Sequence, residues 1–126
     1  MSSPKSWLVL SELATAVFLV WPQENAVASD PTAFKRYCSA CHSVEVGRNK
    51  IGPSLAGIVG RQSASIEGFN YSAPMRSLGV VWTKENLDRY LTAPADMVAG
   101  TNMMFPGLRK EDERRSLIEY LANPDG

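Results

Sequence analysis

The two cysteines and the single histidine of the chain all lie within residues 38–42, which read Cys-Ser-Ala-Cys-His. Two thiols separated by two residues and followed directly by an imidazole form the spacing of c-type haem attachment. Cys38 and Cys41 can each form a thioether with one vinyl group of a haem, and His42 can then bind the iron as the proximal ligand. We therefore predict one covalently attached haem c per chain, held by Cys38, Cys41 and His42.

Three other uses of this segment compete with haem attachment: a zinc half-site, a thioredoxin-type redox pair and a disulfide. A structural zinc site usually has four ligands, and the sequence contains no second cluster of cysteine and histidine. A redox Cys-x-x-Cys normally follows a strand in a βαβ pattern, which this region lacks. The disulfide is the remaining alternative.

The first 28 residues resemble a secretory leader. Lys5 precedes a largely apolar run over residues 7–21, and residues 26–28 read Ala-Val-Ala, which fits a cleavage site. The run is about 15 residues long, which is short for a bilayer span. We therefore predict a cleaved signal peptide over 1–28, a single domain over 29–126 and a periplasmic location. The alternative is an uncleaved leader that tethers the protein to the membrane.

The predicted mature chain is small and nearly neutral. Cleavage would remove Lys5, Glu12 and Glu24 from the 13 basic and 13 acidic residues, which leaves a formal charge of +1. A nucleic-acid-binding protein would show a basic stripe, so we expect no nucleic-acid partner. A chain of this size forms only a marginal core by itself, and a buried haem would add apolar volume.

The sequence predicts an all-α fold with helices at both ends and long irregular loops between them. Asp30-Pro31 is typical of a helix start. The apolar face of this first helix would hold Phe34, Tyr37, Cys38 and Cys41, which would point both thiols inward.

Three further helices are expected along the chain. Ser72 would cap a short helix that Gly79 ends, and Thr83 would cap a helix that ends before Pro94. Acidic residues open a last helix over 111–122, where they favour the helix dipole. We expect irregular structure over 94–107, a stretch rich in Pro, Gly, Ala and Met.

The Gly-rich stretch over 43–66 is typical of a loop around a flat cofactor rather than of a strand or a long helix. The carbonyl of Pro53 could accept the Nδ1–H of His42 and fix its tautomer, although Gly-Pro more often forms a simple turn. Tyr71 and Trp82 have apolar rings with polar tips, for which haem propionates would be suitable partners.

The sixth ligand of the iron decides between an electron carrier and a protein open to small molecules. No second histidine exists, so methionine sulfur is the best candidate. Beyond the leader the methionines are Met75, Met97, Met103 and Met104. The residue types alone do not select one of them.

Five blocks of the sequence, in this order and spacing, resemble the class I cytochromes c, in particular the branch of mitochondrial cytochrome c and bacterial cytochrome c2. The blocks are residues 38–42, 52–55, 68–71, 100–107 and 117–121, and the resemblance extends from Asp30 to Ala122. It implies the class I cytochrome c fold, with a few helices and long loops around one haem. It also implies a soluble, monomeric one-electron carrier between membrane or soluble redox proteins, and not an enzyme.

The same resemblance implies roles for individual residues. Met103 would be the second axial ligand, and Met104 would face away from the iron. The other haem contacts implied are the Pro53 carbonyl on the haem histidine, Arg61, Tyr71 and Trp82 at a propionate, and Tyr90 at the methionine sulfur. Phe34 would meet Leu117 and Tyr120 where the first and last helices cross.

The sequence departs from the family in the lysines around the haem edge. Asn102 replaces the lysine beside the ligand, and Ala95-Asp96 stand where a lysine pair is usual. A smaller basic patch could form from Arg48, Lys50, Arg109 and Lys110. Because complementary charge steers docking, this departure leaves the identity of the redox partners open. The alternatives to a carrier are a haem enzyme or gas sensor, and a subunit of a larger redox complex.

Overall fold

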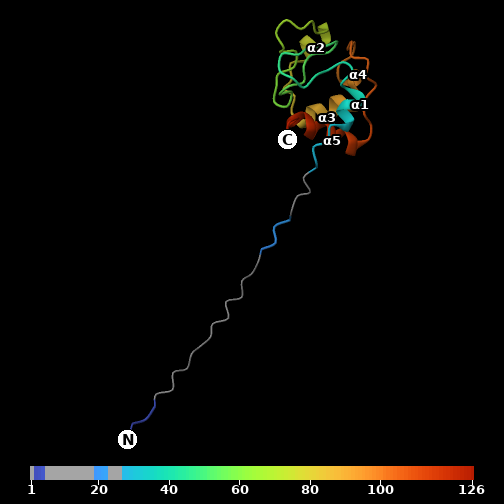
Figure 1. The fold of residues 1–126 in the computed structure, drawn as a ribbon. Helices are drawn as coiled ribbons and strands as arrows, with labels where there is room; N and C mark the ends of the chain where they lie inside the picture. The colour runs from blue at the N-terminus through green and yellow to red at the C-terminus, as the bar shows by residue number, and fades with distance from the viewer. Residues whose placement is uncertain (1, 5–18, 23–26) are drawn as a thin grey trace.

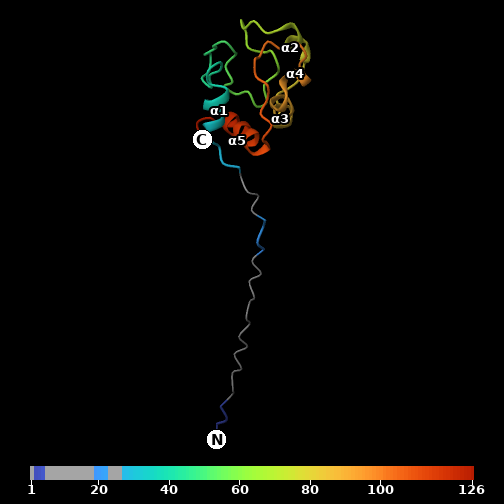
Figure 2. The same cartoon turned by 90° about the vertical axis from the view of Figure 1, so that its right-hand side faces the viewer.

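The protein is described here by a computed structural model, which covers residues 2–4, 19–22 and 27–126. Its helices are α1 (Thr32–Tyr37), α2 (Ala73–Leu78), α3 (Lys84–Thr92), α4 (Pro94–Met97) and α5 (Glu111–Ala122). Within these ranges there is no strand, and Gln62 and Val81 form an isolated antiparallel bridge. Figures 1 and 2 show α1, α3 and α5 gathered at one end and α2 at the other, with long loops between. The predicted all-α fold is confirmed.

Side-chain caps set the bounds of two helices, as the sequence predicted. The Ser72 hydroxyl accepts the Met75 N–H at 3.3 Å, and the Thr83 hydroxyl accepts the Asn86 N–H at 3.1 Å. Gly79 ends α2 with a φ of 63°, a left-handed conformation that glycine adopts without steric cost. These caps depend on neighbouring residues only, which is why the sequence could predict them.

The first helix is shorter than expected and does not carry both cysteines. It ends at Tyr37, and Cys38 is its C-cap residue, so Cys41 lies beyond the helix. Cys38 is buried, whereas Cys41 is exposed. The prediction that both thiols point inward is therefore wrong for Cys41, because a helical period cannot place a residue that lies beyond the end of the helix.

Helix α4 lies within residues 94–107, where the sequence predicted irregular structure, so that prediction is wrong for Pro94–Met97. Pro94 occupies its first turn, where the fixed φ of proline favours helix and its missing N–H costs nothing. Four residues are too few to show an apolar period, so the sequence carried no signal for this turn.

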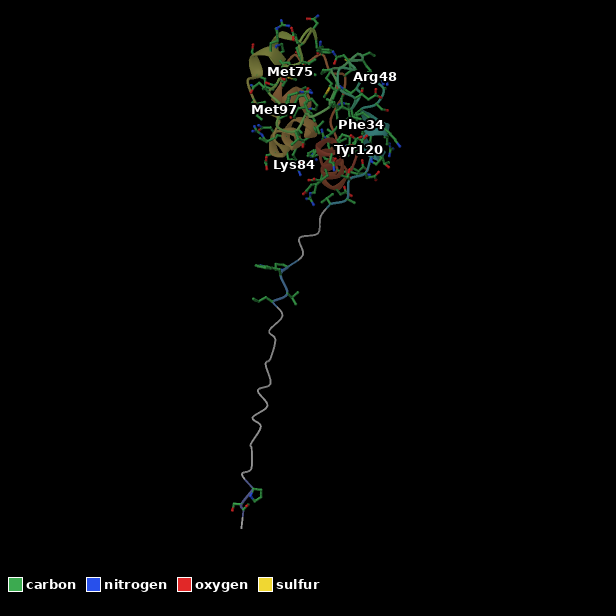
Figure 3. The ribbon with its side chains drawn as sticks, turned by 60° about the vertical axis from the view of Figure 1, so that its left-hand side comes forward. Phe34, Arg48, Met75, Lys84, Met97 and Tyr120 are labelled. Carbon is green, nitrogen blue, oxygen red and sulfur yellow. The ribbon has the colours of Figure 1, made fainter. Side chains whose placement is uncertain are left out.

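The core forms where α5 crosses α1 and α3. The rings of Phe34 and Tyr120 lie with centroids 5.5 Å apart, and Leu117 is fully buried between the helices. Figure 3 shows Phe34 and Tyr120 side by side at this crossing. The predicted contact between the first and last helices is confirmed. Lys84 of α3 also pairs with Glu119 of α5 at 2.7 Å.

The predicted signal peptide lies mostly outside the described residues, which omit 5–18 and 23–26. Of the apolar run, Leu19, Val20 and Trp21 are described and are exposed. No described helix has both the length and the apolar character that a membrane crossing requires. The leader and its cleavage therefore stay predictions.

Candidate functional site

His42 is fixed from two directions by backbone groups. The backbone N–H of His42 donates to the Cys38 carbonyl at 2.8 Å, which closes the turn after α1. Its Nδ1 lies 2.7 Å from the Pro53 carbonyl oxygen. A carbonyl can only accept, so Nδ1 carries the proton and Nε2 keeps the lone pair with which an imidazole binds a metal. Burial lowers the pKa of His42, which favours the same neutral form.

Gly52 lies against the face of the imidazole. A Cβ atom at this position would lie 2.3 Å from the Cε1 atom of His42 and 2.6 Å from its Nδ1. The N–H of Gly52 donates to the Cys41 carbonyl at 2.8 Å, so the loop is held close to the haem-attachment segment. From the sequence this glycine is expected only as part of a turn. Its contact with His42 joins segments ten residues apart and leaves no local signal.

The two cysteines differ in their surroundings. Burial raises the pKa of Cys38 to about 11, so its thiol is protonated at neutral pH. Cys41 is exposed, and both cysteines are free, which does not support the disulfide alternative. The described residues contain no cluster of three or more His, Cys, Asp or Glu side chains that could hold a metal ion.

Met103 and Met104 point in opposite directions. Met103 is partly buried against the core, and the Tyr90 hydroxyl donates toward its Sδ atom at 3.8 Å. Tyr90 is itself buried and packs on Trp82 with ring centroids 5.0 Å apart. Met104 is 98% exposed. The structure thereby separates two neighbouring methionines that residue chemistry alone does not distinguish.

The other two candidate methionines, Met75 and Met97, are partly buried against the hydrophobic core. They come from α2 and α4, and Figure 3 shows both on the side of the domain opposite Arg48. Arg48 lies in the Gly-rich loop that follows His42.

The guanidinium of Arg61 has one N–H group without a hydrogen-bond partner. Its two terminal nitrogens donate to the carbonyls of Ala56 and Ser54, each at 2.9 Å. Its Nε is buried and lacks a hydrogen-bond partner. Among the described residues, every other buried side-chain nitrogen or oxygen has a partner. The main chain joins Arg61 to Trp82, whose N–H donates to the Arg61 carbonyl at 2.8 Å. The Tyr71 hydroxyl accepts the Ile66 N–H at 3.2 Å.

These side chains fit a covalently attached haem. The free thiols suit its vinyl groups, and the neutral imidazole and the thioether suit its iron. A buried guanidinium N–H without a partner costs free energy unless it meets an acceptor, and a propionate carboxylate is such an acceptor. The unpaired Nε–H of Arg61 therefore fits an anionic group such as a haem propionate.

Comparison with known proteins assigns the chain to a family. Residues 31–124 match the family described as Cytochrome c. The chain belongs to the cytochrome c family. As a cytochrome c it carries one covalently attached haem c and is a monohaem electron carrier, as the sequence predicted.

Relatives of this cytochrome c come from animals, plants and bacteria. It is 48% identical over 88 residues to "Cytochrome c 2.1" of Caenorhabditis elegans, with 70% of this chain and 79% of the relative covered. It is 44% identical over 94 residues to "Cytochrome c2 iso-2" of Magnetospirillum molischianum, with 75% and 96% covered. It is 38% identical over 122 residues to "Cytochrome c-554" of Methylosinus trichosporium, with 94% and 92% covered.

Proposed function

We propose that this cytochrome c carries single electrons between redox proteins, with its iron bound by His42 on one side and by Met103 on the other. The opposite orientation of the two neighbouring methionines is the observation that carries the ligand assignment. Met103 turns inward to the Tyr90 hydroxyl, whereas Met104 is exposed. When bound, haem supplies an iron that gains or loses one electron.

The protein residues would keep both ligands in place in both oxidation states. Pro53 holds the imidazole by its Nδ1–H, at a distance of 2.7 Å, so the ring does not rotate. Tyr90 orients the Met103 sulfur. A thioether is a soft, neutral ligand that favours ferrous iron and raises the reduction potential. Two retained ligands leave little to rearrange when the charge changes, which suits a carrier better than an enzyme.

The remaining predicted haem contacts complete the proposed site. Cys38 and Cys41 would form the two thioethers. Arg61 would donate its free Nε–H to a propionate, which Tyr71 and Trp82 would also contact, and the Trp82 N–H is bonded to the Arg61 carbonyl. The donor and acceptor proteins would be membrane-bound or soluble redox proteins that dock briefly to a monomer of this protein.

We also propose that the protein acts in the periplasm after removal of residues 1–28. The motif that supports this is the apolar run followed by Ala-Val-Ala. N-terminal sequencing of the exported protein tests it. A sequence that begins at Ser29 supports cleavage, and one that retains the leader supports a membrane tether.

The far-red absorption band between sulfur and ferric iron tests the ligand assignment. We expect the band in the unsubstituted oxidised protein and in Met104→Ala, and its loss in Met103→Ala. Loss in Met104→Ala instead would show that the wrong neighbour was assigned. Ready carbon monoxide binding by the reduced, unsubstituted protein at neutral pH would contradict a closed sixth position and favour a gas-binding haem protein.

A further inference from the structure

The Met103 loop, residues 98–110, joins α4 to α5 and carries the proposed ligand. Its beginning is fixed within the loop itself. The Thr101 N–H donates to the Val98 carbonyl at 3.0 Å, and the Thr101 hydroxyl accepts the Met103 N–H at 3.2 Å. Val98 is 2% exposed, so this part of the loop is anchored in the core.

The far end of the Met103 loop is fixed to α3. The Leu108 N–H donates to the Leu91 carbonyl at 2.8 Å. Gly107 lies so close to the end of α3 that a Cβ atom there would be 2.1 Å from the Thr92 carbonyl oxygen. Its φ of +113° is also one that other residues rarely adopt.

Arg114 of α5 bonds both to this far end of the loop and to α3, and we call this set of bonds the clasp. Arg114 is 8% exposed, although it carries a charge. Its Nη1 donates to the carbonyls of Leu108 at 2.9 Å and Arg109 at 3.3 Å. Its Nε donates to the Oδ1 atom of Asp88 on α3 at 2.6 Å. The planar guanidinium thus joins the carboxylate of one helix to the carbonyls at the end of the loop.

We propose that Arg114, oriented by Asp88, is a positioning residue for the Met103 sulfur. The inference rests on the proposed ligation by Met103. Helix α3 supplies both the Tyr90 hydroxyl that contacts the sulfur and, two residues earlier, the Asp88 carboxylate that fixes Arg114. The clasp holds the loop and the sulfur relative to one helix, so its loss should let the sulfur leave the iron more often.

A second ion pair between the same helices provides a matched control. Lys84 and Glu119 join α3 to α5 at 2.7 Å, with side chains 46% and 30% exposed. Neither side chain bonds to the Met103 loop among the contacts of the described residues. Removing this pair should weaken the contact between the helices and leave the loop end in place.

Imidazole binding to the oxidised, haem-loaded protein measures how often the sulfur leaves the iron. Imidazole can bind only when the sixth position is open, so its apparent affinity rises with the open fraction. We expect Asp88→Asn to bind imidazole about tenfold more tightly, because a charge-assisted hydrogen bond holding the closed loop is weakened. Lys84→Gln should leave the imidazole affinity unchanged. Asparagine matches aspartate in shape, so the fold should be kept.

Amide hydrogen exchange at Leu108 provides a readout that does not depend on the iron. Opening of the clasp exposes the N–H that donates to Leu91, so its exchange should be about tenfold faster in Asp88→Asn and unchanged in Lys84→Gln. Arg114→Lys, which keeps the charge and loses the fork, should shift both readouts in the same direction.

The outcomes separate this proposal from the ligand assignment. Suppose that the unsubstituted protein shows the far-red band. If Asp88→Asn and Lys84→Gln then change the imidazole affinity equally, or both leave it unchanged, the positioning role of Arg114 is overturned. Absence of the band in the unsubstituted protein would contradict ligation by Met103 itself. Unchanged exchange at Leu108 in both Asp88→Asn and Arg114→Lys would overturn the clasp in either case.

Discussion

Gly52 and His42 lie in contact, with the imidazole ring covering the Gly52 backbone on the side where a side chain would project. A Cβ atom on Gly52 would lie within 2.3 to 2.8 Å of three ring atoms. The same ring is held at Nδ1 by the neighbouring Pro53 carbonyl. Two consecutive residues therefore fix the imidazole: Gly52 packs against the ring, and the Pro53 carbonyl accepts its Nδ1–H.

Gly52→Ala should destabilise the haem-loaded protein by about 1–3 kcal/mol, because the ring or the loop must move to admit the methyl group. Denaturant unfolding measures this loss. Gly57→Ala is the control, since its Cβ would contact nothing within 4 Å and it tests only the cost of a φ of +62°. That cost is about 1 kcal/mol. A loss no larger in Gly52→Ala than in Gly57→Ala would contradict a steric role for Gly52.

Tyr90→Phe should lower the reduction potential. The hydroxyl bond to the Met103 sulfur withdraws electron density from the thioether and so disfavours ferric iron. Loss of a weak hydrogen bond of roughly 0.5–1 kcal/mol corresponds to roughly 20–40 mV for a one-electron couple. A redox titration measures the shift. Tyr37→Phe removes a hydroxyl that bonds to Glu113 at 3.2 Å, and should leave the potential unchanged. An unchanged potential in Tyr90→Phe would show that this contact does not tune the iron.

Ala64→Gly should stabilise the protein. Ala64 has a φ of 54°, the only positive φ of a non-glycine residue in the described ranges. Relief of the left-handed strain of about 1–2 kcal/mol is partly offset by the greater freedom of glycine in the unfolded chain, which leaves a gain of up to about 1 kcal/mol. Thermal unfolding measures it. Ala95→Gly, at an exposed position in α4, should lower stability instead. Lower stability in both variants would show that the backbone at Ala64 is not strained.

Electron transfer should depend only weakly on ionic strength. Two of the four basic residues expected in a patch pair with carboxylates of the chain itself. These pairs are Arg48 with Glu45 at 2.8 Å and Lys110 with Glu113 at 3.1 Å. We expect the second-order rate constant with ferricyanide to change by less than about threefold between about 0.05 M and about 0.5 M salt. A change of about tenfold or more would indicate a charged docking surface that these pairs do not neutralise.

The sequence by itself determined the cofactor and much of the local architecture. Thioether attachment and proximal ligation need only the local spacing of Cys38, Cys41 and His42. The caps at Ser72 and Thr83 are likewise bonds between residues three positions apart. The resemblance of five ordered blocks added the family, which the comparison confirms. All of these features depend on residues that lie close together in the sequence, so they can be recognised without knowing the fold.

Only the tertiary structure decided which groups meet across the loops. It set Gly52 against His42, left the Arg61 Nε without a partner and brought Arg114 to Asp88. The physical reason is that irregular loops have no repeating period from which a side-chain direction can be read. Their paths are fixed by hydrogen bonds and packing between residues far apart in the chain, and those contacts exist only once the helices have come together.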